Sequence, residues 1–360
     1  MNGERFRELV GGHRRGIVAS TLRSLLLLLE LPYSGVTSLR NRFYDSGLIK
    51  TRQVPFPVVS VGNLTLGGTG KTPMVAWLAR FFLEQGFRPG LISRGYGKST
   101  DGVNDEFLEL AVRLPTVPHR QNRDRVAAAM EFREHREKEP IDMLILDDAF
   151  QHRRIARDLD IVLLDTSEPF GFEHVFPRGT LRETLGGLRR ADIVLLSRAD
   201  GIELAERERI RNRVLSIAPN VIWGEIVHRP QTLVTVSKVE ERLESIRGKS
   251  VLAFCGIGNP NAFRQMLLRN GTKVVEFVSF PDHHHFTPHD LVHLEEMAKK
   301  LKVEDVLCTM KDLVKIERAC IADLPIKAVM IDIEFLSGEE TVRQRLVKTV
   351  DTWKNKKEPR

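Results

Sequence analysis

The sequence is poor in cysteine, and this limits the kinds of protein it can be. Only three cysteines occur in 360 residues, and none of them forms a C-x-x-C pair. Because the number is odd and the spacing irregular, a disulfide framework is excluded and a reducing compartment is favoured. We interpret Cys255, Cys308 and Cys320 as small apolar residues of a core.

Other features are also missing. The chain has no long low-complexity tract and no fixed-period repeat, which excludes disordered and solenoid proteins. It has no nucleic-acid recognition module, so we expect no nucleic-acid partner. What remains is a globular chain, 42% hydrophobic and 29% charged, that is long enough for two domains. Its formal net charge of +7 favours anionic partners such as nucleotides or phospholipid surfaces.

The N-terminal region lacks an apolar run of about 20 residues, the length that a membrane-spanning helix needs. Residues 16–31 come closest, with successive leucines from Leu25 to Leu29, but Arg23 interrupts the apolar pattern. Basic residues precede this segment as in a signal peptide, yet no small-x-small cleavage site follows, so secretion is not expected. Two interpretations stay open: a helix that rests in the lipid headgroup layer, and an ordinary buried helix.

From Phe56 onward, short apolar runs alternate with helical patterns. This alternation predicts an α/β fold, in which a larger domain has a mostly parallel sheet with helices on both faces and a smaller α/β unit follows. Residues 227–248 are less regular and are predicted to connect the two. The predicted strands are 58–61, 90–93, 142–146, 161–164, 193–197, 250–254, 274–278, 306–309 and 328–333, and the predicted helices are 71–84, 123–138, 204–214 and 261–269.

The strongest motif is a glycine-rich phosphate-binding loop between the first predicted strand and the first predicted helix of this region. In such a loop, backbone N–H groups converge on phosphate oxygens, Lys71 reaches the β- and γ-phosphates, and Thr72 binds Mg²⁺. The usual pattern begins with a glycine at the position of Thr65. The residues expected to bind ATP are Thr65, Gly67, Gly68, Thr69, Gly70, Lys71 and Thr72.

An acidic pair follows a second buried strand. The apolar run 143–146 ends in Asp147 and Asp148, where P-loop proteins place a carboxylate that helps to hold Mg²⁺. Because two acids at the end of a buried strand are costly without a cation, we expect both to bind the metal together with Thr72. Residues 197–200 occupy the place of the base-reading [NT]-K-x-D segment of many P-loop proteins, but the match is weak and a plain loop explains it equally well.

A kinase also needs a group that takes the proton of the acceptor hydroxyl, and a cation that balances charge on the transferring phosphoryl. Asp105 and Arg94 can supply these, although each taken alone is typical of a protein surface. The histidines from His283 to His285 make a poor zinc site, because three successive side chains point in different directions. A histidine that orients or assists a carboxylate base is the better interpretation.

Taken together, the motifs resemble those of the tetraacyldisaccharide 4'-kinases, which phosphorylate the lipid A precursor in Gram-negative-type bacteria. The resemblance covers nearly the whole chain, and it depends on the order of the segments more than on any one of them. The family's threonine-leucine-glycine-glycine loop also explains why glycine is missing at position 65. The matching segments are 39–41, Tyr44, 61–73, 93–97, 146–152, 157–158, 181–183, 256–260, 280–284 and 309–312.

The resemblance implies two three-layer α/β/α lobes and a reaction that uses ATP and Mg²⁺. In this reaction the γ-phosphoryl of ATP moves to the 4'-hydroxyl of an acylated glucosamine disaccharide 1-phosphate. The family's proposed base falls on Asp105 and its assisting histidine on His283, with the adjacent His284 as the alternative. Lys71 and Arg94 complete the expected catalytic set. Asn104 stands where the family has the glycine before its base.

The lipid nature of that substrate favours a membrane-contacting N-terminal helix, on the cytoplasmic face of the inner membrane. The expected partners are the acylated disaccharide lipid and the inner-membrane surface, and no protein partner is predicted. The corresponding division of the chain is a membrane-associating helix at 1–35, a P-loop kinase domain at 36–226, a connection at 227–248, a smaller α/β domain at 249–345 and a tail at 346–360.

The main alternative is a P-loop GTPase or ATPase switch, or a metallochaperone-type nucleotide-binding protein. Such a protein should carry a clear base-reading segment, which residues 197–200 match only in part. Leu66 also replaces the lysine that dimeric ATPase switches carry before the two glycines. Phosphorylation of an acylated disaccharide distinguishes the kinase from these proteins.

Overall fold

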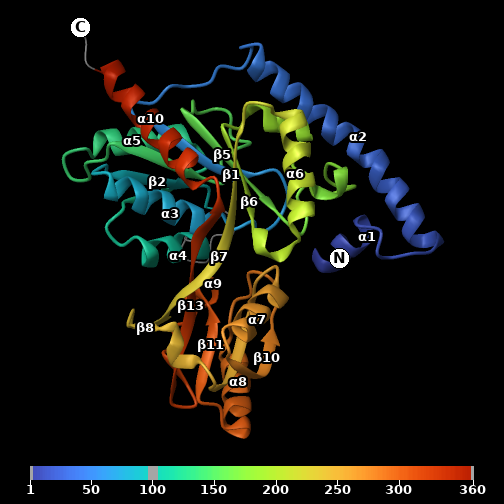
Figure 1. Ribbon diagram of the computed structural model, residues 1–360, viewed down its shortest axis with the longest axis vertical. Helices are drawn as coiled ribbons and strands as arrows, with labels where there is room; N and C mark the ends of the chain where they lie inside the picture. The colour runs from blue at the N-terminus through green and yellow to red at the C-terminus, as the bar shows by residue number, and fades with distance from the viewer. Residues whose placement is uncertain (1–2, 96–103, 358–360) are drawn as a thin grey trace. The chain divides into compact units, whose positions relative to one another are not determined.

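The computed structural model describes residues 3–95 and 104–357. The chain forms two compact units, and neither is continuous in sequence (Figure 1). Because long strands at the boundaries belong to both units, the covalent chain itself links them. Unit 1 consists of Met1–Arg94, Val117–Val227 and Glu334–Arg360, and unit 2 consists of Gly95–Thr116 and His228–Ile333.

Unit 1 is built on a parallel sheet with the strand order β7-β6-β5-β1-β4-β2-β3. Strands β1, β4, β5 and β6 are buried along their whole length, as expected for apolar runs that helices cover on both faces. The strand bounds are β1 Val58–Asn63, β2 Pro89–Ser93, β3 His119–Gln121, β4 Met143–Asp147, β5 Leu159–Asp165, β6 Ile193–Ser197 and β7 Ile222–Thr235.

Helices form the outer layers of unit 1. On one face, α5 (Arg125–Glu134) packs on alternate side chains of β4, and α6 (Leu204–Ile217) packs on alternate side chains of β5 and β6. The helix α3 (Lys71–Glu84) contacts β1, β2 and β4. The C-terminal helix α10 (Glu339–Lys357) lies against α3, where Arg343 stacks over aromatic rings of α3. The predicted helix at 71–84 and the predicted parallel α/β fold are confirmed.

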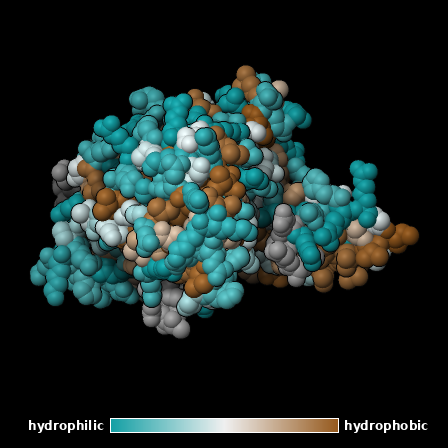
Figure 2. Space-filling model, turned by 90° about the horizontal axis from the view of Figure 1, so that it is seen from below, coloured by the Kyte–Doolittle hydropathy of each residue, from teal (hydrophilic) through white to brown (hydrophobic). Residues whose placement is uncertain are grey.

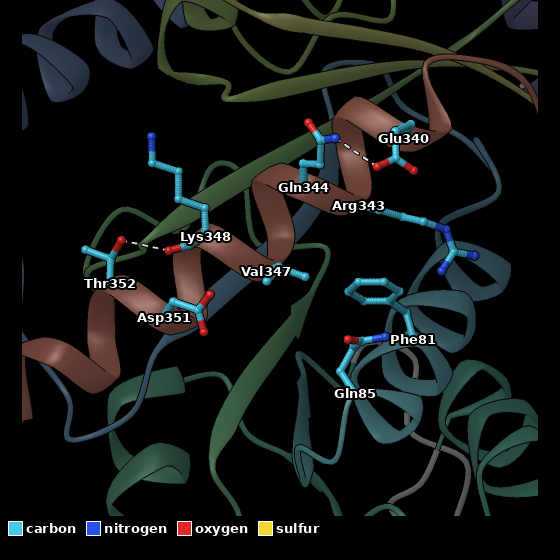
Figure 3. Close-up of a pocket in the computed structure, with 9 residues that line it drawn as sticks. All are labelled: Phe81, Gln85, Glu340, Arg343, Gln344, Val347, Lys348, Asp351 and Thr352. Atoms are coloured by element: carbon cyan, nitrogen blue, oxygen red, sulfur yellow. Dashed lines mark hydrogen bonds between the residues drawn. The ribbon is translucent and has the colours of Figure 1, made fainter.

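A shallow groove lies along this helix pair. Figure 3 shows the groove between α3 and α10, where Phe81 and Gln85 face Arg343 and Val347. Its volume is about 620 Å³, and it is open to solvent. The side chains that line it belong to none of the motifs found in the sequence.

The N-terminal region forms two helices of unit 1, α1 (Gly3–Val10) and α2 (Ile17–Asp45). The apolar segment predicted at 16–31 is therefore only the first part of a longer helix, which continues through Pro32. Contacts of the second half with the body of unit 1 override the weak helix propensity there, including Asn41 with Glu183 and Arg40 with Gln151. With 29 residues, α2 has the length and composition of a membrane-crossing helix, which corrects the expectation that this region falls short.

Unit 2 is a smaller three-layer structure. Its parallel strands follow the order β10-β9-β11-β13, and the two faces of this sheet carry different helices. Even-numbered side chains of β9 pack with α8, and odd-numbered ones pack with α7. The bounds are α4 Asp105–Arg113, β8 Glu240–Arg242, β9 Ser250–Cys255, α7 Pro260–Arg269, β10 Lys273–Ser279, α8 Pro288–Leu301, β11 Asp305–Thr309, α9 Met310–Leu313, β12 Cys320–Ile321 and β13 Leu324–Ser337.

Two stretches are more regular than the sequence suggests. Residues 227–248 contain the second half of β7, the short strand β8 and a 3-10 turn over Leu243–Ile246. The charged and proline residues at 228–231 obscure the strand pattern, which resumes with the buried pair Leu233 and Val234. Residues 346–360, assigned to a tail, begin inside α10, where Leu346 and Val350 are buried.

Candidate active site

The phosphate loop connects β1 to α3 in unit 1. Its backbone takes left-handed torsion angles at Gly67 (φ 123°) and Gly70 (φ 87°). These angles favour glycine, because the Cβ of any other residue makes a positive φ sterically unfavourable. Gly70 is the N-cap of α3, so Lys71 and Thr72 lie in the first turn of that helix. The positive end of the helix and its free N–H groups thus lie at the loop, as anion binding requires.

Thr65 explains why the loop does without its usual first glycine. It forms an antiparallel bridge with Leu181, its side chain is buried, and its carbonyl accepts a hydrogen bond from Asn63 Nδ2 at 2.8 Å. The chain is therefore still extended at position 65, and the turn begins at Gly67. A residue in extended backbone needs no left-handed freedom, so threonine fits.

Lys71 lies in a cluster of charges. Its Nζ is 3.5 Å from Asp148 Oδ1 and 3.5 Å from Asn63 Oδ1. Arg182 binds the same carboxylate through Nη1, at 2.8 Å and 2.9 Å from its two oxygens. Burial would raise the pKa of Asp148, but the charges of Lys71 and Arg182 outweigh it and lower that pKa to about 2. Asp148 is therefore an anion at any working pH, beside the lysine expected to bind phosphate.

The acidic pair lies where the sequence predicts it. Asp147 is the last residue of β4 and is 3% exposed, and Asp148 follows with a left-handed φ of 48°. Such a torsion is unusual for a residue other than glycine and is typical of strained functional turns. Oxygen donors from two carboxylates and the hydroxyl of Thr72 are the ligand types that Mg²⁺ prefers, so these residues fit the expected metal.

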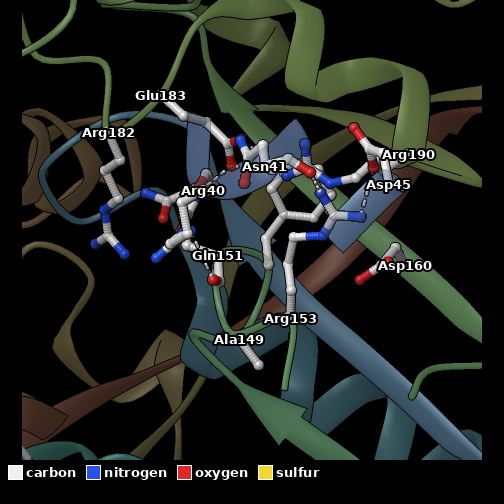
Figure 4. Close-up of polar contacts among 12 residues, drawn as sticks. Arg40, Asn41, Asp45, Ala149, Gln151, Arg153, Asp160, Arg182, Glu183 and Arg190 are labelled. Atoms are coloured by element: carbon white, nitrogen blue, oxygen red, sulfur yellow. Dashed lines mark hydrogen bonds and ion pairs between the residues drawn. The ribbon is translucent and has the colours of Figure 1, made fainter. Parts of the chain in front are cut away.

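Behind this cluster lies a buried acid that sequence reasoning did not select. Glu183 is 1% exposed, and Figure 4 shows it together with Asn41, Gln151 and Arg190. Arg190 Nη2 donates to both carboxylate oxygens, at 2.8 Å and 2.9 Å, and Asn41 Nδ2 donates at 2.7 Å. Gln151 links Glu183 to the carbonyl of Asn63. The network ties α2 and the segment 181–183 to the base of the phosphate loop.

Arg182 and Glu183 belong to the Leu-Arg-Glu segment that supports the family resemblance, but no role was assigned to them. The available signal was an arginine next to an acid in a loop without helix or strand pattern. Sequence alone does not show the partner of either residue, because Arg182 binds Asp148, which is 34 residues away, and Glu183 binds Asn41 on α2.

Two other arginines differ in their placement. Arg94 follows β2 directly and is exposed. Arg198, in the segment considered as a base reader, instead donates through Nη2 to the carbonyl of Gly68 at 3.1 Å and forms an ion pair with Asp165. Residues 197–200 thus meet the phosphate loop through Arg198. Burial lowers the pKa of Arg198 to about 10, and it remains a cation.

Asp105 lies in unit 2, together with two cationic or titratable partners. His283 Nδ1 is 2.9 Å from Asp105 Oδ2, and Lys311 Nζ is 3.7 Å from the same oxygen. Lys311 Nζ also lies 3.2 Å from His283 Nε2. Burial raises the pKa of Asp105, but the hydrogen bond from His283 and the charge of Lys311 lower it to about 2. The carboxylate is thus ionised and oriented.

The two adjacent histidines have different partners in the structure. His283 has a left-handed φ of 60° and faces Asp105. His284 turns away, pairs with Asp290 at 3.0 Å and stacks on Phe280 with ring centroids 4.7 Å apart. Among residues 3–95 and 104–357, no group of three or more His, Cys, Asp or Glu side chains is arranged to hold a metal ion.

Asn104, which stands in place of the family's glycine, is the N-cap of α4. Its Oδ1 accepts from Phe107 N–H at 3.0 Å, and Asp105 is the first residue of the helix. We expect Asn104→Ala to lower the free energy of unfolding by about 1 kcal/mol, and Asn104→Gly by only a few tenths. Urea denaturation measures both. Equal losses for the two variants would contradict the capping role.

The chain is similar to known proteins along nearly its whole length. Residues 22–351 match the model of the family described as tetraacyldisaccharide-1-P 4'-kinase. A tetraacyldisaccharide 4'-kinase of Syntrophus aciditrophicus (strain SB) is 37% identical over 338 residues, covering 86% of this chain and 88% of the relative. One of Anaeromyxobacter sp. (strain Fw109-5) is 37% identical over 353 residues, covering 93% and 94%.

A solved structure is similar as well. The crystal structure of LpxK from Aquifex aeolicus, in complex with ATP, aligns with a TM-score of 0.73 and 29% sequence identity. The alignment covers 91% of this chain and 99% of that chain. The similarity thus extends to both units.

Proposed function

The chain belongs to the tetraacyldisaccharide-1-P 4'-kinase family, and from this premise we propose how its residues divide the work. It is an ATP-dependent kinase that transfers the γ-phosphoryl of ATP to the 4'-hydroxyl of an acylated glucosamine disaccharide 1-phosphate, the lipid A precursor. The alternative of a nucleotide-dependent switch is not favoured. Our proposal rests on two clusters, each described within its own unit: the charged cluster around Lys71 at the phosphate loop of unit 1, and the ionised acid-histidine pair of unit 2.

We assign phosphate binding to the loop from Gly67 to Thr72. The amides at the N-terminus of α3 and the ammonium of Lys71 meet the negative charge of the triphosphate. Thr72 and the acidic pair would hold Mg²⁺, and the bound ion would supply positive charge to the triphosphate. Arg182 keeps Asp148 ionised and oriented, so we add it to the residues that support this cluster. Arg94 keeps its proposed role as a cation that balances charge on the transferring phosphoryl.

We assign proton removal to Asp105. The 4'-hydroxyl must lose a proton as it attacks the γ-phosphorus and as the bond to the bridging oxygen of ATP breaks. The proton passes to Asp105 Oδ1 or Oδ2, and ADP leaves with the electron pair. His283 donates its Nδ1 proton to Asp105, while its Nε2 accepts from Lys311, so the neutral ring orients the base.

Incubation of the purified protein with γ-labelled ATP and the acylated disaccharide 1-phosphate tests the overall reaction. Label should appear on the lipid at the 4'-position and not at the 1-position, as mass spectrometry of the product can resolve. Release of labelled phosphate without labelled lipid would count against the assignment of the acceptor.

We further propose that α2 places the enzyme on the cytoplasmic face of the inner membrane. The first half of α2 exposes a row of apolar side chains to solvent, which is costly unless another apolar phase covers them. Figure 2 shows brown side chains gathered at the right-hand edge, where α2 lies in Figure 1. The exposed fractions are Ile17 87%, Val18 75%, Leu25 53%, Leu28 67% and Leu29 52%.

Two glutamates on this row should release the protein from membranes. A fully buried leucine contributes about 1.5–3 kcal/mol, so we expect Leu25→Glu/Leu28→Glu to lower partition into vesicles containing anionic lipid by at least about tenfold. The matched control is Leu204→Glu on α6, because Leu204 is 58% exposed in the same unit. Co-sedimentation measures the partition. Equal behaviour of the double variant and the control would rule out α2 as the contact.

A further inference from the structure

Residues 1–21 precede the span that matches the family, yet part of this segment packs on unit 1 close to the phosphate loop. In α1, Leu9 and Val10 are each 3% exposed. Phe6 lies beside Phe176 with ring centroids 6.1 Å apart, and Arg178 Nη1 donates to the carbonyl of Val10 at 2.9 Å. These apolar and polar contacts dock α1 on the body that carries the nucleotide site.

Arg7 extends from α1 to the loop itself. Its Nε lies 2.7 Å from Glu168 Oε1, and its Nη2 donates to the carbonyl of Leu66 at 3.4 Å. A Cβ added at Gly67 would lie 2.5 Å from the same Nη2. The guanidinium therefore packs against the first glycine of the loop that has a left-handed φ.

Glu168 closes a ring of contacts around Leu66. It accepts a hydrogen bond from Thr180 Oγ1 at 3.1 Å, and the carbonyl of Thr180 accepts from Leu66 N–H at 2.7 Å. Both backbone groups of Leu66 are thus held, one by Thr180 and one by Arg7. Leu66 lies between two parts of the loop. Residues 64–66 pair with residues 180–182, and the glycines that follow have the amides expected to bind the phosphates.

We propose that Arg7 is a positioning residue for ATP binding, which fixes the carbonyl of Leu66 and so presets the amides of Gly67 and Gly68. Donors that are already oriented bind an anion more tightly, because no ordering cost is paid on binding. Arg7 contacts Leu66, at the start of the loop, and not Lys71, the residue expected to bind the transferring phosphoryl. The contact should therefore stabilise bound ATP and the transition state equally. Such uniform binding changes KM and leaves kcat almost unchanged.

Arg7→Ala tests this in the full-length protein. The variant should raise the Kd of ATP–Mg²⁺, measured by direct titration without lipid, about fivefold to tenfold. The KM for ATP should rise in parallel, with kcat within about twofold. The matched control is Arg14→Ala, which removes the same charge from the same segment, because Arg14 pairs with Glu8 and not with the loop. Arg7→Lys keeps the charge but not the forked geometry and should restore part of the affinity.

Glu168→Gln provides a second route, since it weakens the same ring while the apolar contacts of α1 stay in place. Glu168→Gln should also raise the Kd of ATP–Mg²⁺. The double variant Arg7→Ala/Glu168→Gln should raise this Kd by less than the product of the two single effects, because both substitutions act through one contact. Equal Kd values for Arg7→Ala and Arg14→Ala would overturn the proposal. So would a loss of kcat at unchanged Kd. The titration needs no acceptor, so its outcome is independent of the role of Asp105.

Discussion

Replacing Lys71 by alanine should lower kcat/KM about 10²–10³-fold, which is the effect expected when a preorganised charge is removed from the transferring group. The ammonium of Lys71 lies at the N-terminus of α3, where it adds to the helix end in balancing charge on the γ-phosphoryl. Because that charge shifts during transfer, most of the loss should appear in kcat. Steady-state kinetics with the acylated disaccharide as acceptor measures it.

Lys71→Arg serves as the control for charge. It retains the cation but places a larger, planar group against Asp148 and Asn63, so activity should recover only partly. Both variants should keep the fold, since Arg182 continues to neutralise Asp148 through its two hydrogen bonds. A variant Lys71→Ala with full kcat and a raised KM alone would show that this lysine binds ATP without stabilising the transfer.

Sequence patterns predicted the elements whose signals are local. The phosphate loop, the helix 71–84 and most of the parallel strands follow from runs of apolar residues and from glycine spacing, and the bounds predicted for α3, β1 and β6 agree with the structure to within about two residues. The strands β3 and β7 were not predicted. Placement of Asp147 and Asp148 at the end of β4 follows in the same way, since the end of an apolar run marks the end of a buried strand.

The remaining features depend on contacts between residues distant in sequence. The partners of Glu183 lie on α2, in the turn that contains Gln151 and at Arg190, and no periodicity connects them. Arg7 lies 59 residues before Leu66, its partner on the loop. The length of α2 was underestimated for a related reason, because tertiary contacts and not helix propensity carry the helix beyond Pro32.

Asparagine in place of Asp105 should lower kcat about 10²–10⁴-fold and leave the Kd of ATP unchanged, because the amide keeps the shape of the base but cannot accept the proton. The contacts described above for the phosphate loop involve residues of unit 1, and the substitution changes none of these residues. Glu295→Gln is the matched control, since it removes a carboxylate of unit 2 that pairs only with Lys299 and Arg318 among the contacts described for it. Equal losses in kcat and in ATP affinity would argue against a base.

The pKa values of Asp105 and His283 predict the pH range in which each group contributes to the stability of the fold. The pKa of Asp105 is about 2, below its ordinary 3.8, so the stability it contributes is present above about pH 4 and is lost as the pH falls towards 2. The hydrogen bond to Asp105 raises the pKa of His283 above 6.5, although burial opposes this. The stability from His283 is therefore present below pH 6.5 and is lost as the pH rises through the raised value.

Asp105→Asn should accordingly lower the pKa of His283, because the main cause of its upward shift is removed. Titration of the His283 ring by NMR measures this directly, and His284, which keeps its contact with Asp290, is the internal reference. The neutral His283 ring accepts a hydrogen bond from Lys311, so the wild-type kcat should rise with pH as this histidine loses its second proton. A wild-type rate that falls across the same pH range would instead require the protonated ring as the active form.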